Sequence, residues 1–139
     1  MKLNKILTVL LIIAFSTVFG QTKSYAKNYF ENGKIESEGW MINNQKTDYW
    51  FYYFDNGNVK EEGHYLSNKK YKWWVIYDKN EEIQKKCNYF DDKLDGLVVI
   101  FNKGKIIKAE KYKKNIKVKE WYSVAAFRKD YLLTSIWVK

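Results

Sequence analysis

The sequence repeats itself every 24 residues, and this period constrains the fold more than any other feature. Large aromatic residues recur at this interval in one column, and Ile or Val recurs in another. The first column consists of Tyr29, Tyr53, Tyr77 and Phe101, and the second of Ile35, Val59, Ile83 and Ile107. Such self-similarity is typical of repeat proteins, in which each unit buries its apolar face against its neighbours. We therefore expect about four stacked units, at residues 27–50, 51–74, 75–98 and 99–122.

Within each unit the residue pattern is that of a β-hairpin. In the second unit, residues 49–54 are rich in strand-forming aromatics, Asn56-Gly57 favours a tight turn, and residues 59–65 alternate between two faces. A period of two excludes an amphipathic helix there. The predicted fold class is all-β, an antiparallel meander of consecutive hairpins in one repeat domain.

The pattern becomes less regular toward the C-terminus. The third unit has Asn80-Glu81 where the second has Asn-Gly, and in the fourth Lys103-Gly104 is displaced by one residue, so both turns are expected to be less regular. Residues 123–139 are predicted to form an atypical cap, because the last repeat must close an open edge. This cap is expected to be either a final hairpin around Arg128-Lys129-Asp130 or a short helix at 124–129.

The N-terminal segment has the pattern of a secretory signal peptide. Two lysines precede an apolar stretch at residues 6–19, and Gly20 suits a cleavage site before Gln21. The stretch is shorter than the roughly 20 residues of a typical membrane-spanning helix, so an uncleaved anchor is the weaker interpretation. We expect residues 1–20 to be removed and residues 21–139 to act in the periplasm, in the cell envelope or outside the cell.

One stretch of the second unit resembles a known repeat. It reads Tyr52-Tyr53-Phe54-Asp55-Asn56-Gly57-Asn58-Val59-Lys60-Glu61-Glu62-Gly63-His64-Tyr65. The aromatic pair, the Asn-Gly turn and the final Gly and Tyr resemble the bacterial MORN-repeat variant, a family that includes antitoxin-like proteins of the YwqK type. The resemblance covers roughly residues 27–122, and departs at Asp48, Lys72 and Glu120, where the family has Gly. It implies a sheet of consecutive hairpins and a role in membrane-linked scaffolding or protein–protein contacts.

Residues that carry catalytic or metal chemistry are scarce. His64, the only histidine, has no counterpart in the other units and is expected to be solvated. Cys87, the only cysteine, is expected to be a small buried residue. Residues 91–96 resemble a calcium loop, but Lys93 stands where a third ligand is required. We therefore predict no enzyme, no metal site and no cofactor; a hydrolase would need a deep pocket that joins His64 to a carboxylate and a hydroxyl.

The chain is basic, with 25 Lys and Arg residues against 16 Asp and Glu residues and a net charge of +9. An excess of this size is ordinary for solubility, but lysines interleaved with aromatics also suit an adhesive surface. The candidate interaction residues are Trp50, Trp74, Lys69, Lys70, Lys72, Lys113 and Lys114. We expect an exported, non-catalytic interaction or scaffold module, antitoxin-like, that binds a protein partner. The alternative is a peripheral binder of anionic membrane lipid through the basic C-terminal half; export argues against nucleic acid.

Overall fold

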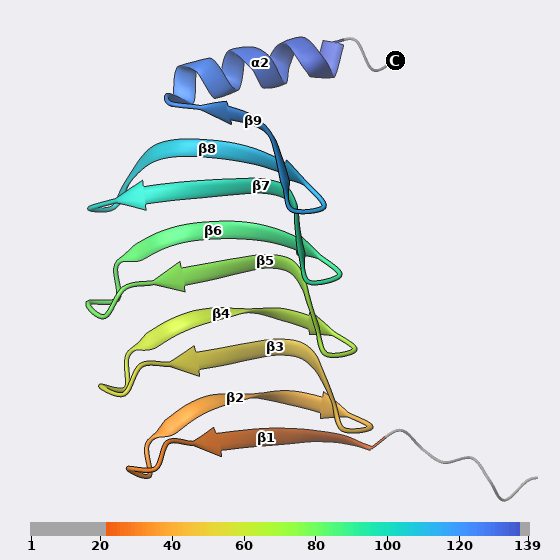
Figure 1. Cartoon of the computed structure of the whole chain (residues 1–139), viewed down its shortest axis with the longest axis vertical. Helices are drawn as coiled ribbons and strands as arrows, with labels where there is room; N and C mark the ends of the chain where they lie inside the picture. Colours follow the sequence, from red (N-terminus) through yellow and green to blue (C-terminus); the bar gives the residue numbers. More distant parts are fainter. Residues whose placement is uncertain (1–21, 137–139) are drawn as a thin grey trace, which may run out of the picture.

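Nine antiparallel strands form one open sheet in which every strand pairs with the next one along the chain (Figure 1). The computed structural model describes residues 22–136, and side chains for residues 22–130, so the predicted signal peptide at 1–20 lies outside the described residues. The strands are β1 (Lys23–Tyr29), β2 (Ile35–Ile42), β3 (Gln45–Tyr53), β4 (Val59–Leu66), β5 (Lys69–Tyr77), β6 (Ile83–Phe90), β7 (Lys93–Asn102), β8 (Lys105–Lys113) and β9 (Ile116–Trp121). The predicted all-β meander of hairpins is confirmed.

The turns lie at the two opposite ends of the strands and, apart from Lys103-Gly104, are of a different kind at each end (Figure 1). At one edge, which we call the tight-turn edge, each turn consists of two residues that both have positive φ angles: Asn43-Asn44, Ser67-Asn68, Asp91-Asp92 and Lys114-Asn115. Turns of this kind match the right-handed twist of the flanking strands. Longer turns at the opposite edge join the first three pairs of strands.

The third of these longer turns is as regular as the first two, contrary to the prediction from its missing Gly. The backbone N–H of Asp78 donates to the Glu82 carbonyl at 2.9 Å, as the equivalent groups do in the earlier units. Glu81 has a φ of 65°, where Gly57 has 95°. The Asp78 carboxylate accepts hydrogen bonds from the N–H groups of Asn80 and Glu82, which offsets the strain at Glu81. The fourth turn, Lys103-Gly104, does differ, because it has only two residues.

A β-bulge recurs in the first strand of three successive units. The pairing of β2 with β3 shifts between Gly39 and Trp40, and the pairing of β4 with β5 shifts at the equivalent place. Asp48, Lys72 and Gly96 stand at this position with φ angles of 54°, 60° and 116°. Positive φ is least costly for Gly, so Asp48 and Lys72 hold a backbone shape that Gly96 adopts without strain.

The core follows one row of directly paired residues across the sheet. Paired residues in an antiparallel sheet share a face, so the whole row lies on one side, which we call the tryptophan face. The row consists of Ala26, Gly39, Trp50, Gly63, Trp74, Cys87, Val98, Glu110 and Glu120. Trp50 and Trp74 are its largest buried side chains.

Each of these tryptophans lies over a glycine of the preceding strand. A Cβ atom added to Gly39 would lie 2.4 Å from the Trp50 ring, and one added to Gly63 would lie 2.4 Å from the Trp74 ring. The Trp74 indole N–H also donates to the His64 carbonyl at 3.0 Å, and Trp50 makes the equivalent bond at 2.8 Å. Only a residue without a side chain leaves room for the indole, so Gly and Trp form one packing unit.

Consecutive hairpins are tied together along the tight-turn edge. The Asn68 side-chain oxygen accepts a hydrogen bond from the backbone N–H of Lys46 at 2.6 Å, and the Asn68 N–H donates to the Lys46 carbonyl at 3.0 Å. Asp92 makes the same pair of bonds to Lys70, and Asn115 makes them to Leu94. Each turn is therefore hydrogen-bonded to a strand of the previous unit, as a stacked repeat requires.

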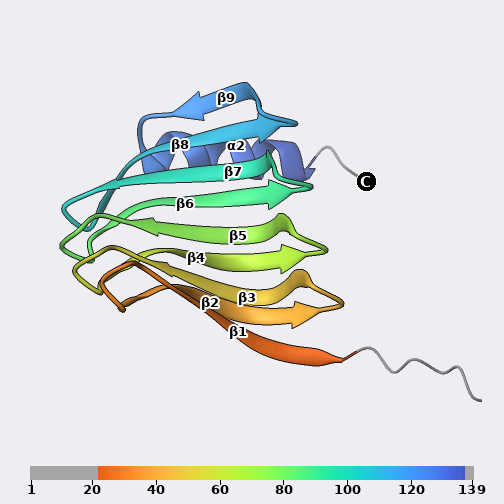
Figure 2. The ribbon, with the colours of Figure 1, turned by 60° about the horizontal axis from the view of Figure 1, so that its bottom comes forward.

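The C-terminal cap is a helix, α2 (Val124–Ile136), packed on the side of the sheet opposite the tryptophan face (Figure 2). Its N-terminus is capped by the Ser123 hydroxyl, which accepts the Ala126 N–H at 3.0 Å. The Phe127 and Trp121 rings meet edge to face with centres 5.2 Å apart. The alternative of a last hairpin around Arg128-Lys129-Asp130 is therefore wrong. Across residues 22–136, no helix has the length and apolarity needed to cross a membrane.

Candidate interaction surface

The two tryptophans that were expected to be accessible are core residues. Trp50 is 1% exposed and Trp74 is 0% exposed, so the expectation that they lie on an interaction surface is wrong. Lysine and tyrosine side chains close over the indoles in place of a second layer. The Lys46 ammonium lies 4.6 Å from the Trp50 ring centre, and the Lys70 ammonium lies 3.9 Å from the Trp74 ring centre. These are cation–π distances, at which the ring face attracts the charge.

Polar groups on the same face hold the covering lysines in place. The Lys46 ammonium donates to the Tyr52 hydroxyl at 2.7 Å, and the Lys70 ammonium donates to the Glu61 carboxylate at 2.8 Å. Burial, together with the nearby charge of Lys70, lowers the pKa of Lys46. The aliphatic stems of both lysines thus cover apolar surface while their ammonium groups keep polar partners. Lys70, which was predicted to contact a partner, is instead a half-buried part of this cover.

The other predicted lysines are exposed and gather along the tight-turn edge: Lys69, Lys72, Lys113 and Lys114. Three of them border two adjoining shallow depressions that share Tyr71 and Phe90. We call this surface the tight-turn patch, and define it as Leu66, Lys69, Tyr71, Lys72, Phe90 and Lys113. Lys114 lies in the neighbouring turn, outside the patch.

The centre of the tight-turn patch is apolar and its rim is cationic. Leu66 is 56% exposed and Phe90 is 61% exposed, and the Phe90 ring lies against that of Tyr71 with centres 6.0 Å apart. Lys72 places its ammonium 5.5 Å from the Tyr71 ring centre. No carboxylate among the described residues forms an ion pair with Lys72.

Two other lysines of the patch are held by aspartates. Lys69 pairs with the Asp91 carboxylate, and this hydrogen bond raises the pKa of Lys69 and lowers the pKa of Asp91. Lys113 pairs with Asp95 at 3.2 Å. These contacts hold two lysines beside the apolar centre and leave Lys72 as the lysine of the patch that has no ion pair among the described residues. An apolar centre inside a charged rim is a composition suited to binding a macromolecule.

Sequence reasoning missed Leu66 and Phe90, although a signal for them was present. The two residues are 24 positions apart and each ends its strand directly before a polar tight turn. An apolar residue at that place in two successive units marks a repeated exposed column. Apolar columns in strand interiors, by contrast, are usually buried.

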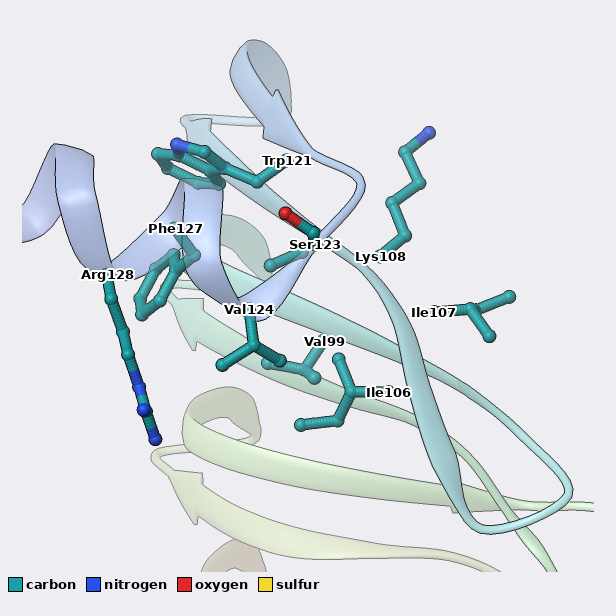
Figure 3. Close-up of a pocket in the computed structure, with 10 residues that line it drawn as sticks. Val99, Ile106, Ile107, Lys108, Trp121, Ser123, Val124, Phe127 and Arg128 are labelled. Carbon is teal, nitrogen blue, oxygen red and sulfur yellow. The ribbon is translucent and has the colours of Figure 1, made fainter.

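A second concave feature lies between α2 and the sheet (Figure 3). This space, which we call the helix cavity, has a volume of about 190 Å³. Its lining includes Val99, Ile106, Trp121, Val124, Phe127 and Arg128. In Figure 3 the side chains of Val99, Ile106 and Val124 converge, whereas the Lys108 ammonium points away. None of these lining residues was predicted from the sequence to belong to a binding site.

The single histidine is not the solvated residue that was expected. Its ring meets the Tyr49 ring edge to face with centres 4.8 Å apart, and its Nδ1 atom is buried with no hydrogen-bond partner in the described part of the chain. Neither the tight-turn patch nor the helix cavity includes His64. Cys87 is buried, as expected, and burial raises the pKa of its thiol. Within residues 22–136, no three His, Cys, Asp or Glu side chains are grouped so that they could hold a metal ion.

Several lysines of the basic C-terminal half form ion pairs with carboxylates. Lys108 lies 2.7 Å from Glu110 and 2.8 Å from Glu120, and Lys117 lies 2.7 Å from Glu120. Hydrogen bonds from Lys108 and Lys117 lower the pKa of Glu120 to about 2. Lys119 similarly pairs with Asp130 at 2.6 Å. Alternating charges of this kind leave less net potential for attracting anionic lipid than the lysine count suggests.

The fold and the two surfaces define a single-sheet β-hairpin repeat protein with a helical cap. The sheet supplies a rigid frame, and the exposed features lie at its tight-turn edge and beneath its terminal helix. No protein-family model and no curated protein matches this chain.

Proposed function

We propose that the protein is a non-catalytic interaction or scaffold module that binds a protein partner through the tight-turn patch. The observation that carries this proposal is the exposure of Leu66 and Phe90 around one shallow depression at the tight-turn edge, within a rim of lysines. Binding energy at protein interfaces is concentrated in a few apolar or aromatic anchors that the partner covers, with polar groups around them. Phe90 has the size, exposure and fixed setting of such an anchor.

The charge around the patch favours a partner with acidic residues beside an apolar pocket. Lys72 carries an unpaired charge next to Tyr71, and Lys69 and Lys113 keep their ammonium groups at the surface while paired with aspartates. Complementary charge speeds the encounter and selects the partner more than it tightens the complex. We therefore expect salt to slow association while the apolar anchor sets the lifetime of the complex.

Export and the family resemblance complete the proposal. The charged start and apolar stretch within residues 1–20 support action outside the cytoplasm, and the repeat pattern at 27–122 supports a place among antitoxin-like MORN-repeat variants. Mass spectrometry of the protein recovered from producing cells tests the first point. A mature chain that begins at Gln21 is expected, and a full-length chain retained in the cytoplasm would contradict it.

Site-specific photo-cross-linking tests the binding surface. A photoreactive residue at position 90 is expected to capture one defined partner in producing cells. The same residue at position 29 is the matched control, because Tyr29 is 57% exposed but lies at the opposite edge of the sheet. With that partner purified, Phe90→Ser should weaken binding by roughly tenfold or more, and Tyr29→Ser should not. Equal capture at both positions, or unchanged affinity of Phe90→Ser, would refute the proposal that the tight-turn patch binds the partner.

Anionic lipid is the competing partner. Co-sedimentation with phosphatidylglycerol vesicles at low and high salt separates the two proposals. Because Lys108, Lys113, Lys117 and Lys119 of the C-terminal half are ion-paired, we expect weak sedimentation that does not depend on Phe90. Strong, salt-sensitive sedimentation would favour the lipid alternative instead.

A further inference from the structure

The helix cavity is lined almost entirely by apolar side chains and is not filled by them. Val99 from β7, Ile106 from β8, and Val124 and Phe127 from α2 surround a space of about 190 Å³ (Figure 3). A dry apolar cavity of about 150 Å³ accepts a molecule of the size of benzene. The space is therefore large enough for an aromatic ring or a short alkyl chain.

The mouth of the cavity is open to solvent. Ile106 is 49% exposed and Val124 is 44% exposed, although both are large apolar residues. An apolar ligand that entered between them would cover this surface as well as fill the space. The gain from removing apolar area from water is roughly proportional to the area covered.

One cation at the cavity has no partner among the described residues. Arg128 projects from α2 beside Phe127, and its guanidinium forms no ion pair or hydrogen bond with any group in the described part of the chain (Figure 3). The other charged lining residue, Lys108, is turned away and occupied by Glu110 and Glu120. A guanidinium offers two parallel N–H donors that match the two oxygens of a carboxylate.

From this combination we propose that the helix cavity binds a small soluble carboxylate whose apolar part is a phenyl group or a medium-length alkyl chain. The apolar part lies among Val99, Ile106 and Phe127, and the carboxylate remains at the mouth beside Arg128. The charge of Arg128 selects an anion over a neutral or cationic amphiphile of the same length. This site is separate from the tight-turn patch, so either proposal can fail without the other.

Calorimetric titration of the folded protein with hexanoate, octanoate and decanoate tests the proposal. Affinity is expected to rise roughly fourfold per added methylene until the cavity is filled, and then to level off. Octanol and octylammonium are the charge controls, and both are expected to bind more weakly than octanoate. Absence of saturable octanoate binding, or equal binding of octylammonium, would overturn the assignment.

Three variants locate the site. Arg128→Gln is expected to weaken octanoate binding about twofold to fivefold and to leave octanol binding unchanged, because the lost contact is a solvent-exposed ion pair. Lys129→Gln removes a charge from the same helix outside the cavity and should change neither. Ala109→Leu places extra bulk in the cavity lining and should weaken both ligands.

Melting curves establish that each variant is folded before titration. If Ala109→Leu unfolds, Val124→Phe narrows the mouth from the exposed side and serves the same purpose. Unchanged octanoate affinity in the folded cavity variants would place binding elsewhere and refute the proposal. Sedimentation with phosphatidylglycerol vesicles in the absence of octanoate binding would also overturn it, in favour of a membrane surface.

Discussion

Where a residue differs between successive units, the residue that it contacts on the neighbouring strand differs as well, in a way that preserves the contact. Where the second unit places Gly63 beneath Trp74, the third places the larger Cys87 beside the smaller Val98. A second exchange occurs on the opposite side of the sheet. Tyr77 donates to the Glu62 carboxylate at 2.6 Å, whereas the next unit has Phe101, without a hydroxyl, 5.9 Å from the Lys86 ammonium. The repeat therefore maintains contacts between neighbouring strands more strictly than it maintains residue types.

A double-mutant cycle tests the first exchange. Gly63→Cys alone should lower the free energy of unfolding by about 1–3 kcal/mol, because its Cβ would overlap the Trp74 ring. Trp74→Val alone should lower it by about 3 kcal/mol through the space left behind. The double variant recreates the Cys87–Val98 pair and should lose at least about 1 kcal/mol less than the sum, as measured by urea denaturation.

The matched control for that cycle is Gly57→Cys. Gly57 has a φ of 95° and open space around its Cα, so its substitution strains the backbone without touching Trp74. Its effect should add to that of Trp74→Val. Additive effects in the Gly63 cycle as well would contradict the proposed packing unit.

Glu81 is a site where a glycine should stabilise the protein. Its φ of 65° is strained for a residue with a side chain, and Gly33 and Gly57 occupy the equivalent position in the earlier turns. Relief of that strain exceeds the extra chain entropy of Gly, so Glu81→Gly should raise the free energy of unfolding by about 0.5–1 kcal/mol in urea denaturation. Glu82→Gly, at a neighbouring position without positive φ, should lower it. Destabilisation by both variants would refute the strain argument.

At the level of strands and hairpins, each unit is tied to the unit before it along the tight-turn edge. Each turn bonds to a strand two places earlier, through Asn68 to Lys46 and through Asp92 to Lys70. A unit of two strands is too small to be stable alone, so these ties and the cross-strand contacts supply what a second layer supplies in other β proteins. Lys46 and Lys70 therefore contribute twice. Their backbone N–H and carbonyl groups bond to the turn of the next unit, and their side chains cover the tryptophans.

Hydrogen exchange at the Lys46 amide reports directly on one such tie. Asn68→Ala removes the acceptor that lies 2.6 Å from this N–H and should destabilise the protein by about 1 kcal/mol, with faster exchange at Lys46. Asn68→Asp keeps an acceptor, as Asp92 does in the next unit, and should leave Lys46 protected. Exchange at Lys46 that is unchanged in Asn68→Ala would show that the side chain does not hold the hairpins together.

Across the whole sheet, buried phenols make the fold sensitive to alkali. Burial raises the pKa values of eight tyrosines, and in Tyr89 the pKa reaches about 12. The others are Tyr25, Tyr49, Tyr52, Tyr53, Tyr65, Tyr77 and Tyr112. A phenol whose pKa is higher in the folded state keeps its proton there after the unfolded chain has lost it. The stability that it contributes is therefore complete below pH 10 and is lost as pH rises above 10.

This linkage predicts that the difference in free energy of unfolding between the protein and its Tyr77→Phe variant becomes smaller at alkaline pH. Burial is the main cause that raises the pKa of Tyr77, and the hydrogen bond to Glu62 raises it further. The protein should therefore lose stability faster than Tyr77→Phe between about pH 9 and pH 11.5, as measured by urea denaturation at several pH values. The exposed Tyr29→Phe variant is the control and should follow the unmodified protein. Parallel pH profiles of stability for Tyr77→Phe and the unmodified protein would exclude a contribution of Tyr77 to the loss of stability in alkali.

The repeat, the hairpins and the alternation of faces were predictable from the sequence because they depend on local features. Positive-φ turn residues such as Asn56-Gly57 act within a few positions, and period-two alternation over 59–65 follows from strand geometry alone. The 24-residue columns then place equivalent residues on equivalent strands. No knowledge of distant contacts was needed for the strand order.

Exposure was decided by the tertiary structure, because it depends on which side chains from other strands cover a residue. Trp50 and Trp74 are buried since the Tyr65 ring of β4 lies against both indoles, while Lys46 and Lys70 cover them from four residues earlier on the same strands. Phe90 remains exposed because it ends a strand at an edge that the described residues leave uncovered. The choice of a helix after Trp121 likewise depends on Phe127 and Asp130 meeting that tryptophan. Periodicity determined the frame, and side-chain contacts between neighbouring strands and with the terminal helix determined which surfaces are left for binding.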